Sequence, residues 1–421
     1  MKTLYQYRGF GSVAMLLVVL ALSGCGGTST TEDHTVTPAD KPDPEVVAAT
    51  NGFGLNMLQK LVVEKPAANV FASPTSIALA LAMVYNGAAG DTQTAMSQAM
   101  GLHEFSPKTI NDAFLAMRNS LALPADEAQL TIANAIWTKQ GLTFKPDFLT
   151  TNHDFYGANA ATLDFGSPEA AGVINDWISA QTQGKIPKLV SPEEVQSLLM
   201  FLADAVYFKG KWTVPFDVAA TQDAPFTKAD GTQQPLPMMF QDASFNYLEQ
   251  DGVQVVELPY GKGRMSMIVA LPAKQANLAA FAQSLTPGRW QGWLDGLARH
   301  PGVLKLPRFK VEYEAMLNDT LTQLGMGVAF DPDHADFSGM IDTSKLWLGF
   351  VKHKTFLKVY EQGTEAAAAT GAGMAGSVFI PPDQKFTMIV DHPFFCAIRD
   401  TQTGAILFTG LIKAPEAVPA Q

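Results

Sequence analysis

Cysteine is nearly absent from this sequence, and its scarcity excludes a framework of disulfide bridges. Only Cys25 and Cys396 occur among the 421 residues, whereas disulfide-stapled domains use several pairs. Cys396 lies in the apolar run 394–398, which favours a small core residue over a reactive thiol. Because 47% of the residues are hydrophobic, the composition is that of a folded protein and not of a disordered one.

Positive charge is also scarce. The chain has 29 lysines and arginines against 40 aspartates and glutamates, which gives a formal net charge of −11. It contains no basic run, whereas a nucleic-acid surface needs clustered lysine and arginine. We therefore expect no nucleic-acid partner.

The common catalytic motifs are missing. The sequence contains no G-x-S-x-G, no G-x-x-x-x-G-K-[ST] and no H-E-x-x-H. Asp331, Asp333 and Asp336 could suggest a calcium loop, but the glycine and the terminal glutamate of an EF-hand are absent there. We predict that the chain is not an enzyme and that it has no cofactor and no metal site.

The N-terminus lacks an apolar run long enough to span a bilayer. Its apolar stretch, residues 13–22, follows Lys2 and Arg8 and is shorter than the roughly 20 residues of a transmembrane helix. This pattern indicates a secretory signal over residues 1–24. The ending Leu-Ser-Gly-Cys25 resembles the bacterial lipobox, in which the cysteine becomes the lipidated first residue. Ordinary secretion with an incidental cysteine is the alternative.

One large domain is expected after the signal. Residues 25–49 are rich in threonine, proline and acidic side chains, which indicates a flexible polar tether. Residues 50–415 show no second linker, and residues 416–421 form a short tail. Ser73-Pro74 is typical of a helix start before an apolar helix, and the apolar run 198–208 favours a central strand. Helices dominate the first half and strands the second, so the predicted class is α+β.

An uncharged segment separates two strand-like runs near the C-terminus. Between the runs 355–360 and 385–390, residues 366–382 carry no charge, and alanine and glycine fill the first half of this segment. One interpretation is a flexible linker or a short helix, but Gly371, Gly373 and Gly376 would break a helix within two turns.

Several motifs, taken in order, resemble the serpin family. They are NVFASPTS at 69–76, DAVYFKGKW at 204–212, His353-Lys354, EQGTEAAAA at 361–369 and DHPF at 391–394. The resemblance covers about residues 50–415. It implies a serpin-like fold with helices around a large central mixed β-sheet and an exposed reactive-centre loop between Glu361 and Phe386.

The resemblance also implies a suicide-substrate inhibitor of serine or cysteine endopeptidases. The protease attacks the loop and forms an acyl-enzyme, and the cut loop then inserts as a new strand and traps the enzyme. Alternate hinge positions are small and uncharged, as burial requires, and the single charge falls on the other face. The hinge residues carried over are Glu361, Gly363, Thr364, Glu365, Ala366, Ala367, Ala368 and Ala369.

Two counts place the reactive bond one residue apart. Counting forward from Gly363 at the serpin family's usual spacing gives Ser377–Val378, and counting back from Ile380-Pro-Pro382 and Lys385-Phe386 gives Val378–Phe379. In both cases the residue before the bond is small and uncharged, which favours elastase-like or subtilisin-like targets. The loop glycines weaken strand propensity, so the alternative is a non-inhibitory serpin fold that acts as a binding module or chaperone.

Five further positions match the family's sheet-opening region. Ser73, Ser76 and His353 correspond to positions beneath the opening sheet, and Trp212 to one near its upper entrance. Asp204 stands where the family usually has asparagine, and we hypothesise that it forms a charge-assisted hydrogen bond with His353. The alternative is a buried acid satisfied by water. If Asp204→Asn leaves thermal latency and polymerisation unchanged at every pH, the pair of Asp204 and His353 has no gating role.

Taken together, these features predict an exported monomer. Lipid on Cys25 would anchor it to the cell envelope, and its partners would be target proteases in covalent complexes. Gly26 lacks the aspartate that retains lipoproteins at the inner membrane, so we expect the outer membrane, the cell surface or an extracellular location.

Overall fold

The computed structural model describes residues 41–122, 128–196, 198–342, 346–364 and 385–419. The predicted leader, Cys25, the reactive-bond residues 377–379 and the hinge residues from Glu365 to Ala369 lie outside these ranges.

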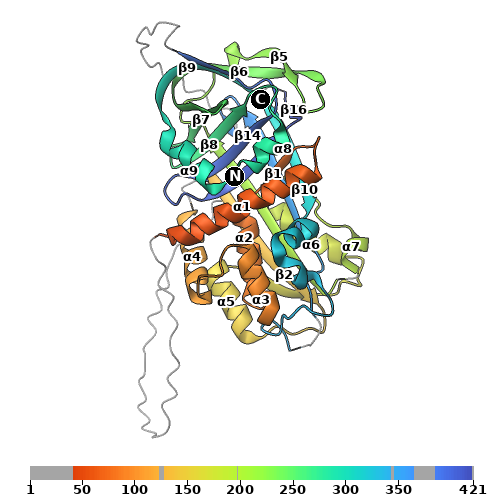
Figure 1. Cartoon of the computed structure of the whole chain (residues 1–421). Coiled ribbons are helices and arrows are strands. Elements are labelled where there is room, and N and C mark those ends of the chain that lie inside the picture. Colours follow the sequence, from red (N-terminus) through yellow and green to blue (C-terminus); the bar gives the residue numbers. More distant parts are fainter. Residues whose placement is uncertain (1–40, 123–127, 197, 343–345, 365–384, 420–421) are drawn as a thin grey trace, which may run out of the picture. The chain divides into compact units, whose positions relative to one another are not determined.

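Helices and strands of the described residues are shown in Figure 1. The helices are α1 (Pro44–Glu64), α2 (Pro74–Tyr85), α3 (Gly90–Ala99), α4 (Pro107–Ser120), α5 (Pro146–Tyr156), α6 (Ala170–Gln181), α7 (Pro192–Gln196), α8 (Leu278–Gln283), α9 (Pro287–Gly296) and α10 (Asn318–Leu321), with short turns η1 (Val218–Ala220), η2 (Thr322–Met326) and η3 (Gly327–Phe330). The strands are β1 (Val70–Ala72), β2 (Ala128–Lys139), β3 (Asn159–Leu163), β4 (Met200–Lys211), β5 (Gln222–Thr227), β6 (Gln233–Gln250), β7 (Val253–Tyr260), β8 (Met265–Pro272), β9 (Ala298–Pro307), β10 (Phe309–Met316), β11 (Val351–Tyr360), β12 (Gly363–Thr364), β13 (Phe386–Ile389), β14 (Phe394–Asp400), β15 (Ile406–Ile412) and β16 (Glu416–Ala417).

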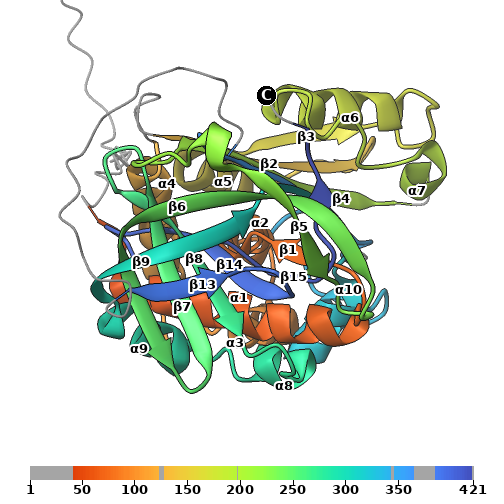
Figure 2. The ribbon, with the colours of Figure 1, turned by 90° about the horizontal axis from the view of Figure 1, so that it is seen from above.

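The strands form two sheets. The seven-stranded sheet has the order β16-β10-β11-β12-β4-β2-β3, and the nine-stranded sheet runs β1-β15-β14-β8-β7-β6-β9-β13 with β5 paired to β6. Seen from above, α6 and α7 lie on one side of β2 and β4, and α1 lies on the other side beside β1 and β15 (Figure 2). The predicted α+β fold with a large mixed sheet is confirmed, because β4 pairs antiparallel with β2 and parallel with β11.

Helix α2 joins the two sheets. It begins at Pro74 after Ser73, whose hydroxyl accepts a hydrogen bond from the Ser76 amide at 3.4 Å, as a helix N-cap does. All twelve of its residues are buried, and it contacts both β4 and β15. A helix that is apolar on every side can be stable only in such a position, so the expectation for this segment is confirmed.

The predicted domain boundaries need correction at both ends. Helix α1 begins at Pro44, capped by the Asp43 side chain, and it already buries Val46 and Val47, so residues 44–49 belong to the fold and not to the tether. The proline and acidic residues that suggested a tether are in fact a helix cap and first turn. At the other end, β16 pairs with β10, and Val418 is only 5% exposed, so the tail also contributes to the sheet.

Cys396 and the lengths of the described helices bear on two further expectations. Cys396 is fully buried in β14, and burial raises the pKa of its thiol far above the usual range, which confirms a core role over a reactive one. None of the described helices has the length and apolar character needed to cross a bilayer.

Candidate functional site

The start of the reactive loop already lies inside the seven-stranded sheet. Strand β12 pairs antiparallel with β11 on one side and with β4 on the other, with Thr364 opposite Val359 and Gly210. Toward the N-terminal end of β11, Val351–Lys354 pairs directly with Leu202–Ala205 of β4. The sheet is therefore open at one end, where the hinge enters, and closed at the other. We call the line between β4 and β11 the seam.

Two glycines make this entry possible. A Cβ atom on Gly363 would lie 2.0 Å from the Gly210 carbonyl oxygen, and its φ of +148° favours glycine. A Cβ atom on Gly210 would in turn lie 2.8 Å from the Tyr260 ring. The backbones of β12 and β4 can approach because Gly363 has no side chain, and the absence of one at Gly210 leaves room for the Tyr260 ring.

An aromatic pair receives the first inserted side chain. Thr364 is 1% exposed, and its hydroxyl lies 2.7 Å from the Tyr260 hydroxyl. Burial raises the pKa of Tyr260 well above its usual range, so this phenol stays protonated and available for hydrogen bonding. Trp212 stacks on Tyr260, with ring centroids 4.3 Å apart, and its indole donates to the Tyr360 carbonyl at 2.9 Å. Trp212 thus fixes the end of β11 at the entrance.

A buried ion pair anchors the turn before the hinge. Glu361 is 2% exposed and accepts hydrogen bonds from the Arg308 guanidinium at 3.0 Å and the Thr221 hydroxyl at 2.8 Å. Arg308 also donates to the Val418 carbonyl at 2.9 Å. The Phe216 amide donates to the Glu361 carbonyl at 2.8 Å. This cluster ties Glu361 to the junction between β9 and β10 and to the C-terminal segment.

The inner face of the closed part of the seam is held by the start of α2. The Ser73 amide donates to His353 Nε2 at 3.1 Å, so this ring nitrogen carries no proton, and the Ser73 hydroxyl donates to the Leu407 carbonyl at 2.6 Å. Ser76 and His353 are fully buried. In the parallel register His353 lies opposite Asp204. The side chain of Asp204 lies outside the described residues, so its pairing with His353 stays a prediction.

The structure thus gathers most of the described candidate residues along one seam. Glu361, Gly363, Thr364 and Trp212 lie at its open end, and Ser73, Ser76 and His353 lie at its closed part. Sequence reasoning missed Arg308, Tyr260 and Thr221. For Arg308 the sequence offered only indirect evidence, because a buried Glu361 requires a cationic partner somewhere in the chain. Over the described ranges, no three His, Cys, Asp or Glu side chains are grouped so as to hold a metal.

Comparisons with known proteins agree with this geometry. The model of the family "Serpin (serine protease inhibitor)" matches residues 48–415. The leukocyte elastase inhibitor of Homo sapiens is 34% identical over 382 residues, covering 88% of this chain and all of the relative, and that of Sus scrofa is 36% identical over the same coverage.

Solved structures give the same result. The thermophilic serpin tengpin in its native state matches with a TM-score of 0.82 at 29% identity, covering 90% of this chain and 97% of the other. Human thyroxine-binding globulin matches with a TM-score of 0.79 at 27% identity, covering 88% and 99%. With a family model over most of its length, full-length relatives and a sheet that admits its own loop, the chain belongs to the serpin family of protease inhibitors.

Proposed function

We propose that this serpin acts on elastase-like or subtilisin-like serine endopeptidases and that it has no enzymatic activity of its own. The observation that carries the inhibitory part of the proposal is β12, because a strand already paired on both edges is the point from which the cut loop can continue between β4 and β11. The residues on either side of both candidate bonds are Ser377, Val378 and Phe379, which are uncharged. The names of the leukocyte elastase inhibitors support the same class of target.

We also propose that the protein is a bacterial lipoprotein. A lipidated Cys25 would tether a monomeric inhibitor to the cell envelope of a bacterium, where it would meet foreign or host proteases. The short apolar run and the Leu-Ser-Gly-Cys ending support this location. The two relatives named above come from animals, so the support for a bacterial lipoprotein comes from the N-terminal sequence.

The direct test is the formation of a covalent complex. The purified protein is incubated with pancreatic elastase, with subtilisin and with trypsin, and the products are separated after boiling in detergent. We expect a band at the summed mass with the first two proteases, because the acyl-enzyme survives denaturation, and little or none with trypsin. Mass spectrometry of the released peptide should place the cut within residues 374–379. A sole cut far from that range contradicts the assigned bond.

The same experiment separates the second candidate function. Thyroxine-binding globulin shows that a chain of this fold can be crystallised with a bound hormone, and the loop glycines Gly371, Gly373 and Gly376 favour slow insertion. Clean cleavage with full recovery of protease activity would identify a binding module or a plain substrate instead of an inhibitor.

A further inference from the structure

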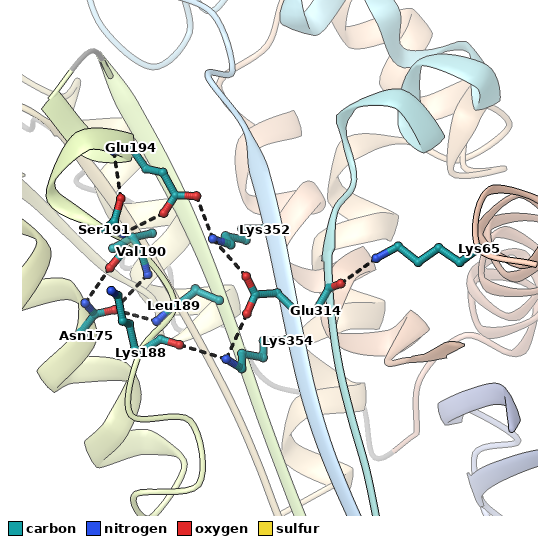
Figure 3. A network of polar contacts seen from close by, with 10 residues as sticks. All are labelled: Lys65, Asn175, Lys188, Leu189, Val190, Ser191, Glu194, Glu314, Lys352 and Lys354. Carbon is teal, nitrogen blue, oxygen red and sulfur yellow. Dashed lines mark hydrogen bonds and ion pairs between the residues drawn. The ribbon is translucent and has the colours of Figure 1, made fainter. Parts of the chain in front are cut away.

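A network of charged residues lies on the outer face of the seven-stranded sheet, over the closed part of the seam (Figure 3). Lys352 of β11 donates to Glu194 of α7 at 2.9 Å and pairs with Glu314 of β10 at 3.1 Å. Lys354, also of β11, pairs with Glu314 at 3.0 Å and donates to the Lys188 carbonyl at 3.2 Å. The network therefore joins two neighbouring strands to the segment that leads from α6 into α7.

That segment is fixed to α6 by hydrogen bonds of its own. The Asn175 carboxamide of α6 accepts from the Leu189 amide at 2.7 Å and the Val190 amide at 3.0 Å, and it donates to the Val190 carbonyl at 2.8 Å. Glu194 closes a capping box, because its Oε2 accepts from the Ser191 amide at 2.7 Å. Residues 188–194 and α6 therefore form one unit, which we call the cover.

The cover packs mainly on the β4 side of the seam. Its apolar side chains share a cluster with residues of β2 and β4; the members include Ile174, Ile178, Leu189, Val190, Val195, Trp137, Phe201 and Ala203. Lys352 and Lys354 belong to the other side, because they extend from β11. They also lie within Val351–Lys354, the four residues that pair directly with β4.

Insertion of a strand must separate these two sides. A new strand between β4 and β11 moves them apart by about 4.8 Å, one strand spacing. The 2.9 Å contact from Lys352 to Glu194 and the 3.2 Å contact from Lys354 to the Lys188 carbonyl span that gap. The contacts to Glu314 do not, since β10 and β11 remain neighbours.

We infer that Glu194 and Lys352 form a latch across the seam and that its strength sets the rate at which the cut loop enters the sheet. The latch thereby governs how many protease encounters end in trapping and how many in release of a cleaved inhibitor. The inference rests on the proposed inhibitory function, but the latch acts on the sheet whether or not a protease is present.

Burial and charge agree with this role. Lys352 is only 8% exposed, so its ammonium depends on the two carboxylates for its hydrogen bonds. Burial alone would raise the pKa of Glu194, but hydrogen bonds from Lys352 and Ser191 outweigh burial and lower the pKa below its usual range. Both partners are therefore charged at neutral pH.

The variant Glu194→Gln isolates the latch from the fold of the cover. A glutamine has one side-chain oxygen, which can still accept from the Ser191 amide and keep the capping box, while its NH₂ group cannot accept from Lys352. A synthetic peptide with the sequence of residues 364–377 is incubated with the protein, and its annealing into the sheet is followed on native gels. We expect annealing to be about 3- to 10-fold faster in Glu194→Gln, as for the loss of one charge-assisted hydrogen bond.

Three more variants complete the test. Lys352→Met keeps an apolar stem and should accelerate annealing to a similar degree, and the double variant should be little faster than either single one because both remove the same contact. Glu312→Gln removes an exposed ion pair with Lys310 on β10, away from the seam, and should anneal at the wild-type rate. Equal rates in Glu194→Gln and wild type, or an equal gain in Glu312→Gln, overturn the latch. A wild-type protein that anneals the peptide but forms no covalent complex with either protease instead contradicts the proposed function.

Discussion

Replacing Thr364 by arginine is expected to turn the inhibitor into a substrate. Thr364 is 1% exposed, lies between β11 and β4, and contacts the Tyr260 hydroxyl at 2.7 Å. An arginine there would have to bury a guanidinium against an aromatic pair with no carboxylate in the hydrogen bonds described for this position. Such burial costs several kcal/mol, so β12 would leave the sheet and the cut loop could enter only at that cost.

The measurement is the stoichiometry of inhibition against elastase or subtilisin. We expect at least about a tenfold rise in the number of inhibitor molecules consumed per protease, because a penalty of about 1.4 kcal/mol on the trapping branch already changes the partition tenfold. The cleavage rate should stay near the wild-type value, since Thr364 lies far along the chain from residues 377–379. Loss of cleavage would show instead that the loop is no longer presented.

A matched control places the same charge on the other face of the strand. Glu365 alternates with Thr364 and is expected to point away from the core after insertion. Glu365→Arg should therefore keep a low stoichiometry, whereas Thr364→Ser should lose little because a hydroxyl remains beside Tyr260. If Glu365→Arg raises the stoichiometry of inhibition as much as Thr364→Arg does, burial of the Thr364 face does not explain the loss of trapping.

The sequence predicted the central strand β4 better than it predicted the contacts that anchor the residues before the loop. The apolar run 198–208 is a local pattern that favoured a central strand, and β4 occupies an interior place in the seven-stranded sheet. Arg308, Tyr260 and Thr221 lie far from Glu361 and Thr364 in sequence. They come from the junction between β9 and β10, from β7 and from the turn before β5, and only the folded chain brings them together. No local pattern encodes those contacts.

The N-terminal boundary shows a second limit of sequence reasoning. Asp43, Pro44 and Glu45 have the composition of a polar linker, but they are also the residue types that begin a helix. Composition over a window cannot separate these two meanings. The distinction comes from Val46 and Val47, which pack into the core from the first turn of α1.

The buried pair at the entrance should have the largest effect on the stability of the native state. Arg308→Met would leave the Glu361 carboxylate, 2% exposed, with the Thr221 hydroxyl as its remaining described side-chain partner. Removing one member of a buried ion pair costs about 3–5 kcal/mol, because the other charge stays buried without compensation. Glu361 lies next to the open end of the seam, so we expect this destabilisation to widen the gap between β4 and β11 at that end.

The expected result is a lower midpoint of thermal unfolding and a larger fraction of latent or polymeric protein on warming, measured by circular dichroism and size-exclusion chromatography. The double variant Arg308→Met, Glu361→Gln should recover most of the loss, because no buried charge remains. Recovery should be incomplete, since the Arg308 hydrogen bond to the Val418 carbonyl is also lost. A double variant no more stable than Arg308→Met would place the effect in that second contact, and the pair with Glu361 would then have no special role in closing the sheet.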